Sequence, residues 1–259
     1  MRADLMLVEK GFATSRNRAQ ELIATGRVFV VSKGQRQPVK KSSLQLNDGE
    51  AIEVAPDPET SHFVSRGGLK MRGALDRLKL VVDGARVLDI GISTGGFSDC
   101  LFQAGARSVV GIDVGHSQLA LKLEKDPRLQ LLEGVNARDL SNVPLIKMNG
   151  GHKFDLIVAD VSFISLTLVL PAIISYLKES GSVIALVKPQ FEVGRAGLGK
   201  NGIVKDASLY AGVETKIRSA AEATGLLVED YFESSIQGFD GNREFFLYAR
   251  SPELAGLFG

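Results

Sequence analysis

The chain has 259 residues, of which 44% are hydrophobic and 24% charged, and this composition excludes a collagen-like, low-complexity or wholly disordered protein. One cysteine excludes a disulfide framework, and three scattered histidines form no group with the spacing of a zinc site. The N-terminal run M-R-A-D-L-M-L-V-E-K has acidic residues where an export signal needs an unbroken apolar core, so we expect a cytoplasmic protein without a resident metal.

The net charge of +1 is distributed unevenly along the chain. Residues 10–41 carry a net charge of +7 and residues 61–80 carry +4, which leaves −10 for the remainder. A basic N-terminal part on an acidic body favours binding of a polyanion such as a nucleic acid. Charge alone is equally compatible with an ordinary solvated surface.

The first 55 residues are typical of a small α+β module. Gly11 ends a segment with helical apolar spacing, Ser15 is a suitable N-cap, and Gly26 is a suitable helix stop. Turn sequences then separate short apolar runs. The predicted elements are helices at 2–10 and 15–26 and strands at 28–31 and 51–54.

A proline-rich segment follows this module. Residues 55–61 read A-P-D-P-E-T-S and hold two of the eight prolines, a composition that supports neither a helix nor a central strand. We therefore predict an N-terminal domain at 1–55, a linker at 56–62 and a larger domain at 63–259.

From residue 81 onward, apolar strands alternate with helical stretches. This order is typical of an α/β protein with a doubly wound, Rossmann-like and mostly parallel sheet. The last two strands can form a hairpin. The predicted strands lie at 86–90, 108–113, 129–133, 154–160, 182–188, 226–234 and 244–249.

Residues 161–177 are uncharged and reach the lower length limit of a membrane span. They contain Pro171 and several hydroxyl side chains, and Asp160 and Lys178 flank them. These features favour a strand end followed by a buried helix.

The run V-L-D-I-G-I-S-T-G-G-F-S-D-C-L at 87–101 predicts a buried strand, a tight glycine turn and a helix. Glycines there let a ligand approach the free amides at the helix start, although a turn that serves only packing is the alternative. Ser93 replaces the second glycine of the dinucleotide fingerprint, and Asp113 ends the next strand, where a carboxylate can accept ribose hydroxyls. We therefore expect S-adenosylmethionine rather than a nicotinamide dinucleotide. The candidate cofactor residues are Asp89, Gly91, Ser93, Gly95, Gly96, Phe97, Asp113 and Asn136.

Polar residues also stand at the predicted strand ends. Asp160 and Lys188 end two strands, Glu244 begins the last one, and Lys70 lies in S-R-G-G-L-K before the first. The carboxyl ends of parallel strands form one edge, where ligands bind in open α/β sheets. Two lysines and two carboxylates there would neutralise one another, either as a catalytic site or as an ion-pair network that closes the sheet edge.

The N-terminal run D-L-M-L-V-E-K-G-F-A-T-S-R-N-R-A-Q-E-L-I-A-T-G-R-V-F-V at 4–30 resembles the S-four-type RNA-binding domain. Three of its arginines stand near the start and end of one predicted helix, where they can meet phosphates. The candidate RNA-binding residues are Arg16, Arg18, Arg27, Lys33, Lys40, Lys41 and Arg66.

The motifs S-R-G-G-L-K, D-I-G-I-S-T-G-G-F-S-D, G-I-D-V-G-H-S-Q-L, D-V-S-F-I-S, V-K-P-Q-F-E-V-G-R and G-N-R-E-F-F, in this order, closely resemble the TlyA (haemolysin A) family of ribosomal RNA 2′-O-methyltransferases. Its methyltransferase part resembles the FtsJ-like enzymes with a Lys-Asp-Lys-Glu tetrad, which Lys70, Asp160, Lys188 and Glu244 match. The resemblance implies S-adenosylmethionine as cofactor and 2′-O-methylation of a cytidine in 16S or 23S ribosomal RNA, free or in ribosomal subunits.

The chemistry gives each of the four residues an expected role. A ribose hydroxyl is a poor nucleophile, so a base must take its proton as the oxygen attacks the methyl group in line. We expect Lys188 to be that base, because burial and a second ammonium group favour its neutral form. Lys70 would stabilise the developing oxyanion, and Asp160 and Glu244 would orient the lysines.

Residues 192–205 contain four glycines and three basic residues, which predicts either a mobile loop that closes over RNA or a plain connector. Base methylation is disfavoured, because no N-P-P-Y-like turn follows the fourth strand and Cys100 is misplaced for a nucleophile. The remaining alternatives are a haemolysin-like membrane-active protein, a nicotinamide-dependent oxidoreductase, and an RNA-binding protein with a non-catalytic nucleoside pocket. We expect no stable membrane association.

Overall fold

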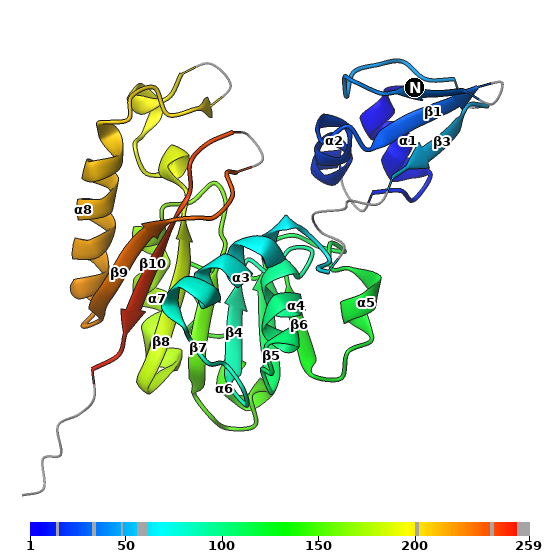
Figure 1. Cartoon of the computed structure of the whole chain (residues 1–259). Coiled ribbons are helices and arrows are strands. Elements are labelled where there is room, and N and C mark those ends of the chain that lie inside the picture. The colour runs from blue at the N-terminus through cyan, green and yellow to red at the C-terminus, as the bar shows by residue number, and fades with distance from the viewer. Residues whose placement is uncertain are drawn as a thin grey trace, which may run out of the picture. The chain divides into compact units, whose positions relative to one another are not determined.

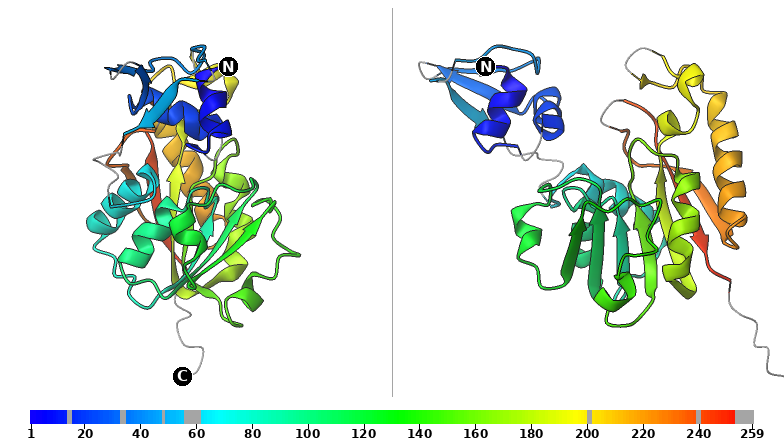
Figure 2. Two further views of the ribbon diagram at one scale, coloured as in Figure 1. Left: turned by 90° about the vertical axis from the view of Figure 1, so that its right-hand side faces the viewer. Right: turned by 180° about the vertical axis from the view of Figure 1, so that it is seen from behind.

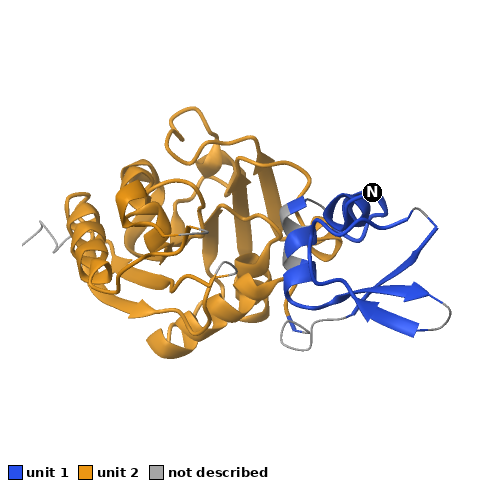
Figure 3. Cartoon of the chain, turned by 90° about the horizontal axis from the view of Figure 1, so that it is seen from above, with its two compact units in different colours: residues 1–62 blue, residues 63–259 orange. Residues whose placement is uncertain are grey.

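The computed structural model describes residues 1–13, 16–32, 35–47, 49–55, 62–199, 202–238 and 241–252. The chain separates into two compact units, Met1–His62 and Phe63–Gly259 (Figure 1, Figure 3). Of the linker predicted at 56–62, only His62 is described. The proposed N-cap Ser15 and the turn predicted at 33–34 also lie outside the described residues.

Unit 1 packs two helices against a three-stranded antiparallel sheet of order β2-β1-β3. Apolar side chains from both helices and from β1 form one core, including Met6, Leu22 and Val28. The sequence did not predict β2, because its residues Q-R-Q-P are all exposed and show no apolar alternation. The elements are α1 (Ala3–Glu9), α2 (Arg16–Ala24), β1 (Val28–Ser32), β2 (Gln35–Pro38) and β3 (Ala51–Val54).

Unit 2 contains a seven-stranded sheet of order β6-β5-β4-β7-β8-β10-β9. The pairs from β6 to β8 are parallel, whereas β10 is antiparallel to both β8 and β9. This arrangement confirms the predicted α/β, doubly wound and Rossmann-like class and the terminal hairpin. The strands are β4 (Arg86–Ile90), β5 (Ser108–Asp113), β6 (Leu129–Glu133), β7 (Phe154–Ala159), β8 (Leu177–Val187), β9 (Leu227–Glu233) and β10 (Phe245–Arg250).

Helices cover both faces of this sheet (Figure 2). Along β4, Val87 packs with α3 and α4, whereas Leu88 and Ile90 pack in the core formed with α7 and α8. The alternation follows from the two-residue period of a strand, so both faces need apolar side chains. The helices of unit 2 are α3 (Arg66–Leu78), α4 (Gly96–Gln103), α5 (Leu121–Glu124), α6 (Leu145–Met148), α7 (Leu170–Ile173) and α8 (Leu209–Glu222).

Helix α3 was not predicted from the sequence, because it contains three glycines, which disfavour helix. Packing explains two of them. A Cβ atom on Gly68 would lie 2.4 Å from the Phe63 ring, and one on Gly73 would lie 2.5 Å from Ser235 Oγ. Close tertiary contacts therefore override the local propensity, and the amphipathic helix buries Met71.

The uncharged stretch at 161–177 does not form the single buried helix that we expected. It forms the 3₁₀ turns η1 (Leu166–Leu168) and η2 (Ile174–Tyr176) on either side of α7, and β8 already begins at Leu177. Its apolar side chains, including Ile173, are buried in the core. Within the described part of the chain, no helix combines the length and the apolar character needed to cross a membrane.

Candidate active site

The carboxyl edge of the parallel strands brings together the polar residues predicted at the strand ends. Asp160 directly follows β7 and Lys188 directly follows β8. Because β10 runs antiparallel to β8, with Phe245 opposite Val187, the preceding residue Glu244 reaches the same edge. Lys70 comes to this edge from α3.

The four side chains form two close ion pairs. Lys188 Nζ lies 2.6 Å from Asp160 Oδ1 and donates a hydrogen bond of 2.8 Å to Ser162 Oγ. Lys70 Nζ lies 2.5 Å from Glu244 Oε2. The side chains of Lys70 and Glu244 are only 11% and 4% exposed, so this pair is largely shielded from water.

The charges of the two pairs act on one another. Burial opposes ionisation of Asp160, but the ammonium groups of Lys188 and Lys70 outweigh it and lower the pKa of Asp160 below its ordinary value. Burial raises the pKa of Glu244; Lys70 opposes this rise, and the charge of Asp160 adds to it. Each carboxyl group therefore responds to both lysines, and the four groups form one electrostatic unit.

The glycine loop after β4 is tied to the end of β5. Asp113 Oδ2 accepts a hydrogen bond of 2.8 Å from the Ser93 amide, and Oδ1 accepts one of 2.7 Å from the Gly115 amide. Gly91, Ser93 and Gly95 have φ values of +80°, +48° and +89°, in the left-handed region that favours glycine. The loop thus turns tightly over the carboxyl edge next to Asp113.

Packing accounts for two of the loop glycines. A Cβ atom on Gly91 would lie 2.5 Å from the carbonyl oxygen of Asp160, and one on Gly96 would lie 2.3 Å from Ser65 Oγ. Phe97 is buried in the core against Phe246. These residues shape the site through tertiary contacts, so the packing alternative raised by the sequence explains part of the motif.

Asp89 is the buried acid of this loop. Its Oδ2 accepts a hydrogen bond of 2.6 Å from Ser98 Oγ, whereas its Oδ1 is buried without a hydrogen-bond donor among the described residues. Burial raises the pKa of Asp89 to about 7; the hydrogen bond from Ser98 opposes the rise, and the charges of Asp160 and Asp113 add to it. A buried acceptor that lacks a donor fits an incoming ammonium group, such as the one on the amino-acid end of S-adenosylmethionine.

Asn136 lies beyond the end of β6 and is exposed. Its Oδ1 accepts a hydrogen bond of 3.0 Å from the Arg138 amide, so the side chain shapes a local turn. The described residues include no cluster of three or more His, Cys, Asp or Glu side chains suited to a metal ion.

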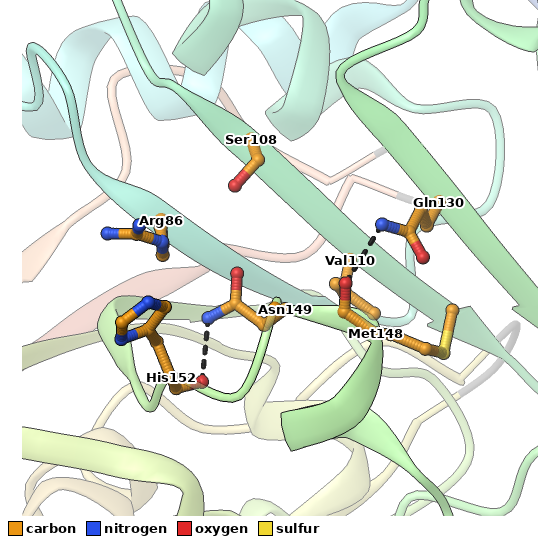
Figure 4. A pocket seen from close by; sticks show the side chains of 8 residues that line it. Arg86, Ser108, Val110, Gln130, Met148, Asn149 and His152 are labelled. Atoms are coloured by element: carbon orange, nitrogen blue, oxygen red, sulfur yellow. Dashed lines mark hydrogen bonds between the residues drawn. The ribbon is translucent and has the colours of Figure 1, made fainter.

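A separate cavity of about 390 Å³ opens at the opposite edge of the sheet (Figure 4). Arg86 and Ser108, the first residues of β4 and β5, line it together with Asn149 and His152. Because Asp89 and Asp113 lie at the other ends of these two strands, the cavity is distinct from the ion-pair cluster.

The family of the chain follows from a comparison of its sequence with known families. Residues 63–251 match the model of the FtsJ-like methyltransferase family. The chain belongs to the FtsJ-like methyltransferase family. The match begins at the first residue of unit 2 and includes all four residues of the ion-pair cluster.

Full-length relatives support the resemblance to TlyA proteins. The chain is 40% identical over 250 residues to the Mycobacterium tuberculosis protein named 16S/23S rRNA (cytidine-2′-O)-methyltransferase TlyA, covering 96% of this chain and 90% of that protein. It is 36% identical to Hemolysin A of Brachyspira hyodysenteriae, covering 95% of this chain and 98% of that protein. A solved Streptococcus thermophilus structure described as a hemolysin matches with a TM-score of 0.74 and 37% identity, covering 98% of this chain and 90% of that one.

Beyond the FtsJ-like unit, two of the predicted RNA-binding arginines of unit 1 have structural partners. Arg16 Nε lies 2.9 Å from Oδ2 of the buried Asp4, and this contact joins α2 to α1. Hydrogen bonds and charges from Arg2, Gln20 and Arg16 hold the pKa of Asp4 well below its ordinary value. Arg27 Nε donates a hydrogen bond of 2.8 Å to the Ala55 carbonyl.

The other candidate RNA-binding residues differ in their surroundings. Lys40 and Lys41 are exposed, and Arg66 of the FtsJ-like unit donates a hydrogen bond of 3.4 Å to the Gln237 carbonyl. Lys33 and the side chain of Arg18 lie outside the described residues.

The segment at 192–205 is built into the fold of the FtsJ-like unit over its described residues. Leu198 and Val204 form an antiparallel bridge, and the Val204 amide donates a hydrogen bond of 3.0 Å to Oδ1 of the buried Asn242. Over its described residues the segment is therefore held to the rest of unit 2 near Glu244, and its closure over RNA stays a prediction; Lys200 and Asn201 lie outside the described residues.

Sequence reasoning missed two neighbours of Asp160. Ser162 accepts the hydrogen bond from Lys188, and Phe163 is 84% exposed with a φ of +64°. The ring centroid of Phe163 lies 5.1 Å from that of Phe191. The motif D-V-S-F contained the signal, because a hydroxyl and an aromatic residue directly follow the strand-end acid.

Proposed function

We propose that this protein transfers a methyl group from S-adenosylmethionine to the 2′-hydroxyl of a cytidine ribose in 16S or 23S ribosomal RNA. The main support is a cluster of two ion pairs, Lys188 with Asp160 and Lys70 with Glu244. Near it lies the buried Oδ1 of Asp89, which has no hydrogen-bond donor among the described residues. The name of the mycobacterial relative supports the same substrate. Action on ribosomal RNA would take place in the cytoplasm.

Two acids would hold the cofactor. Asp89 Oδ1 would accept a hydrogen bond from the ammonium group, and Asp113 would accept hydrogen bonds from the ribose hydroxyls while it keeps the loop amides of Ser93 and Gly115 in place. When bound, S-adenosylmethionine supplies an electrophilic methyl group on a positively charged sulfur.

Lys188 would take the proton of the 2′-hydroxyl. Asp160 and Ser162 hold its Nζ at 2.6 and 2.8 Å, so the amine is positioned before the RNA arrives. Lys188 must first release a proton to solvent, after which it accepts the hydroxyl proton as the oxygen attacks. Lys70, held by Glu244, would stabilise the negative charge on the oxygen.

Phe163 would contact the target nucleotide. Its ring is exposed next to Ser162 and makes a tilted contact with the ring of Phe191. Exposed aromatic rings stack on unpaired bases in RNA recognition.

The decisive experiment is tritiated methyl transfer to separated small and large ribosomal subunits taken from cells that lack this protein, followed by nucleoside analysis. We expect label in 2′-O-methylcytidine. Label on a base, or no transfer to either subunit or to naked ribosomal RNA, would contradict the proposal.

The name of the Brachyspira relative suggests a membrane-active protein as the second function. Leakage of liposomes by the pure protein, measured without a methyl donor, separates the two functions. We expect no leakage.

We also propose that unit 1 binds RNA as an S-four-type domain. The exposed Lys40 and Lys41 are the test residues, because the structure gives them no structural role comparable to that of Arg16. Replacing both with alanine should weaken binding and reduce the slope of log affinity against log salt by about 1 for each lysine. The variant Lys178→Ala in unit 2 is the control and should leave the slope unchanged.

A further inference from the structure

Glu192 is a buried carboxylate outside the four-residue cluster. Its side chain is 2% exposed and lies four positions after Lys188. Oε1 accepts a hydrogen bond of 2.7 Å from the Leu166 amide. Oε2 accepts one of 2.6 Å from Ser165 Oγ and one of 2.7 Å from Lys216 Nζ. Both oxygens are therefore occupied, and the buried charge is compensated.

These contacts join three segments of unit 2. Ser165 and Leu166 belong to the loop that begins with Asp160, Glu192 follows the strand end that carries Lys188, and Lys216 belongs to α8. The carboxylate of Glu192 therefore fixes the distance between the two loops whose first residues form the Asp160 and Lys188 pair.

The connection from Glu192 back to Lys188 is short and hydrogen-bonded. The Phe191 amide donates to the Lys188 carbonyl at 2.9 Å, and the Glu192 amide donates to the Pro189 carbonyl at 2.9 Å, within the 3₁₀ turn η3 (Pro189–Phe191). A shift of Glu192 is therefore passed to the backbone of Lys188.

The connection on the other loop is equally direct. Ser165 is the N-cap of η1, and its hydroxyl contacts both Thr167 and Glu192. The rings of Phe163 and Phe191 make a second contact between the same two loops. A glutamine at this position could still accept from the Leu166 amide, but its amide nitrogen would face the donors Lys216 Nζ and Ser165 Oγ, which would loosen this joint.

We propose that Glu192 is a positioning residue that keeps Lys188 Nζ in register with Asp160 for transfer of the ribose proton. It does so by clamping the loops after β7 and β8 to one another and to α8. This inference rests on the proposed function, because it assumes that Lys188 moves the proton.

The test compares Glu192→Gln with Asp155→Asn. Asp155, near the start of β7, accepts a hydrogen bond of 2.9 Å from the Arg86 amide and pairs with Lys178 at 2.9 Å, so it makes similar contacts at the opposite sheet edge. Single-turnover methyl transfer is measured across pH with saturating cofactor and RNA, and cofactor affinity is measured separately.

We expect Glu192→Gln to lower the single-turnover rate by about tenfold or more, because small displacements of reacting groups have large kinetic effects. The apparent pKa of its pH–rate profile should move, and its cofactor affinity should stay within about twofold of the wild type. Glu192→Asp, which keeps the charge, should recover part of the rate. Asp155→Asn should match the wild type in rate and in pH profile.

Three outcomes would overturn the inference. They are a wild-type rate and pH profile for Glu192→Gln, an equal fall in rate for Asp155→Asn, or a lowered rate with an unchanged pH profile. If Glu192→Gln does not fold, Ser165→Ala decides, because it removes only one hydrogen bond to the carboxylate. A wild-type profile for that variant overturns the inference, and a shifted profile supports it. Failure of the wild-type protein to form 2′-O-methylcytidine would instead overturn the proposed function.

Discussion

An aspartate–lysine pair lies at each end of the neighbouring strands β7 and β8. At the amino edge, Asp155 lies 2.9 Å from Lys178; at the carboxyl edge, Asp160 lies 2.6 Å from Lys188. The two pairs are chemically identical and come from the same two strands. Their lysines differ, because Lys178 is 62% exposed and Lys188 only 13%.

The difference shows that an ion pair alone does not define a catalytic site. Lys178 extends into water, where an isolated pair contributes little. The pair of Asp160 and Lys188 lies within electrostatic reach of Lys70, Glu244 and Asp89. Under the proposed function, its place at the carboxyl edge, near the glycine loop after β4, gives the same two residue types a chemical task.

Replacing Lys188 and Lys178 one at a time should give the largest difference in methyl-transfer rate between the two edges. We expect Lys188→Ala to lower methyl transfer by about a thousandfold, because it removes the proposed base, and Lys178→Ala to leave the rate unchanged. Tritium transfer to ribosomal subunits measures both, and a cofactor titration shows whether binding is intact. Equal rates for the two variants would remove the functional distinction between the edges.

Asp89 should make the proposed binding of the cofactor at the carboxyl edge depend on pH. The pKa of Asp89 is raised from 3.8 to about 7, so between these pH values the folded protein without cofactor holds a proton that an unfolded chain would have released. Its stability therefore falls as the pH rises from about 4 to about 7 and levels off above that. Binding of a cationic ammonium group needs the ionised form. Cofactor affinity should therefore fall about tenfold from about pH 8 to about pH 6.

Calorimetric titration of the wild type and of Asp89→Asn measures this dependence. The asparagine variant should bind more weakly at high pH and lose the pH dependence. A wild-type affinity that is constant across this range would show that Asp89 does not meet the ammonium group.

The amino-edge pair should affect only stability. Burial opposes ionisation of Asp155, but the Arg86 amide and Lys178 outweigh it and lower its pKa. A lowered pKa stabilises the fold at pH values above the ordinary pKa of an aspartate. This contribution is lost as the pH falls through the folded-state pKa. Urea unfolding at neutral pH should show Asp155→Asn to be less stable by about 1 kcal/mol or less. The difference should disappear in acid, and a loss of methyl transfer would contradict this assignment.

Periodicity and strand ends predicted the sheet and the positions of its polar residues. Local patterns could not predict α3, because packing against Phe63 and Ser235 imposes its glycines. They also could not reveal that Arg16 holds Asp4, or that Glu192 contacts Ser165, because these contacts join segments distant in sequence. The carboxyl edge was predictable because parallel topology alone brings its residues together, whereas the supporting contacts depend on the folded chain.

The position of β10 between β8 and β9 has a consequence for synthesis of the protein. Glu244, the partner of Lys70, directly precedes this strand, and the strand itself is among the last described parts of the chain to leave the ribosome. A chain that stops before Glu244 lacks both β10 and the acid that holds Lys70. A chain still being synthesised therefore cannot assemble the four-residue cluster until Glu244 has been translated and β10 has paired with β8.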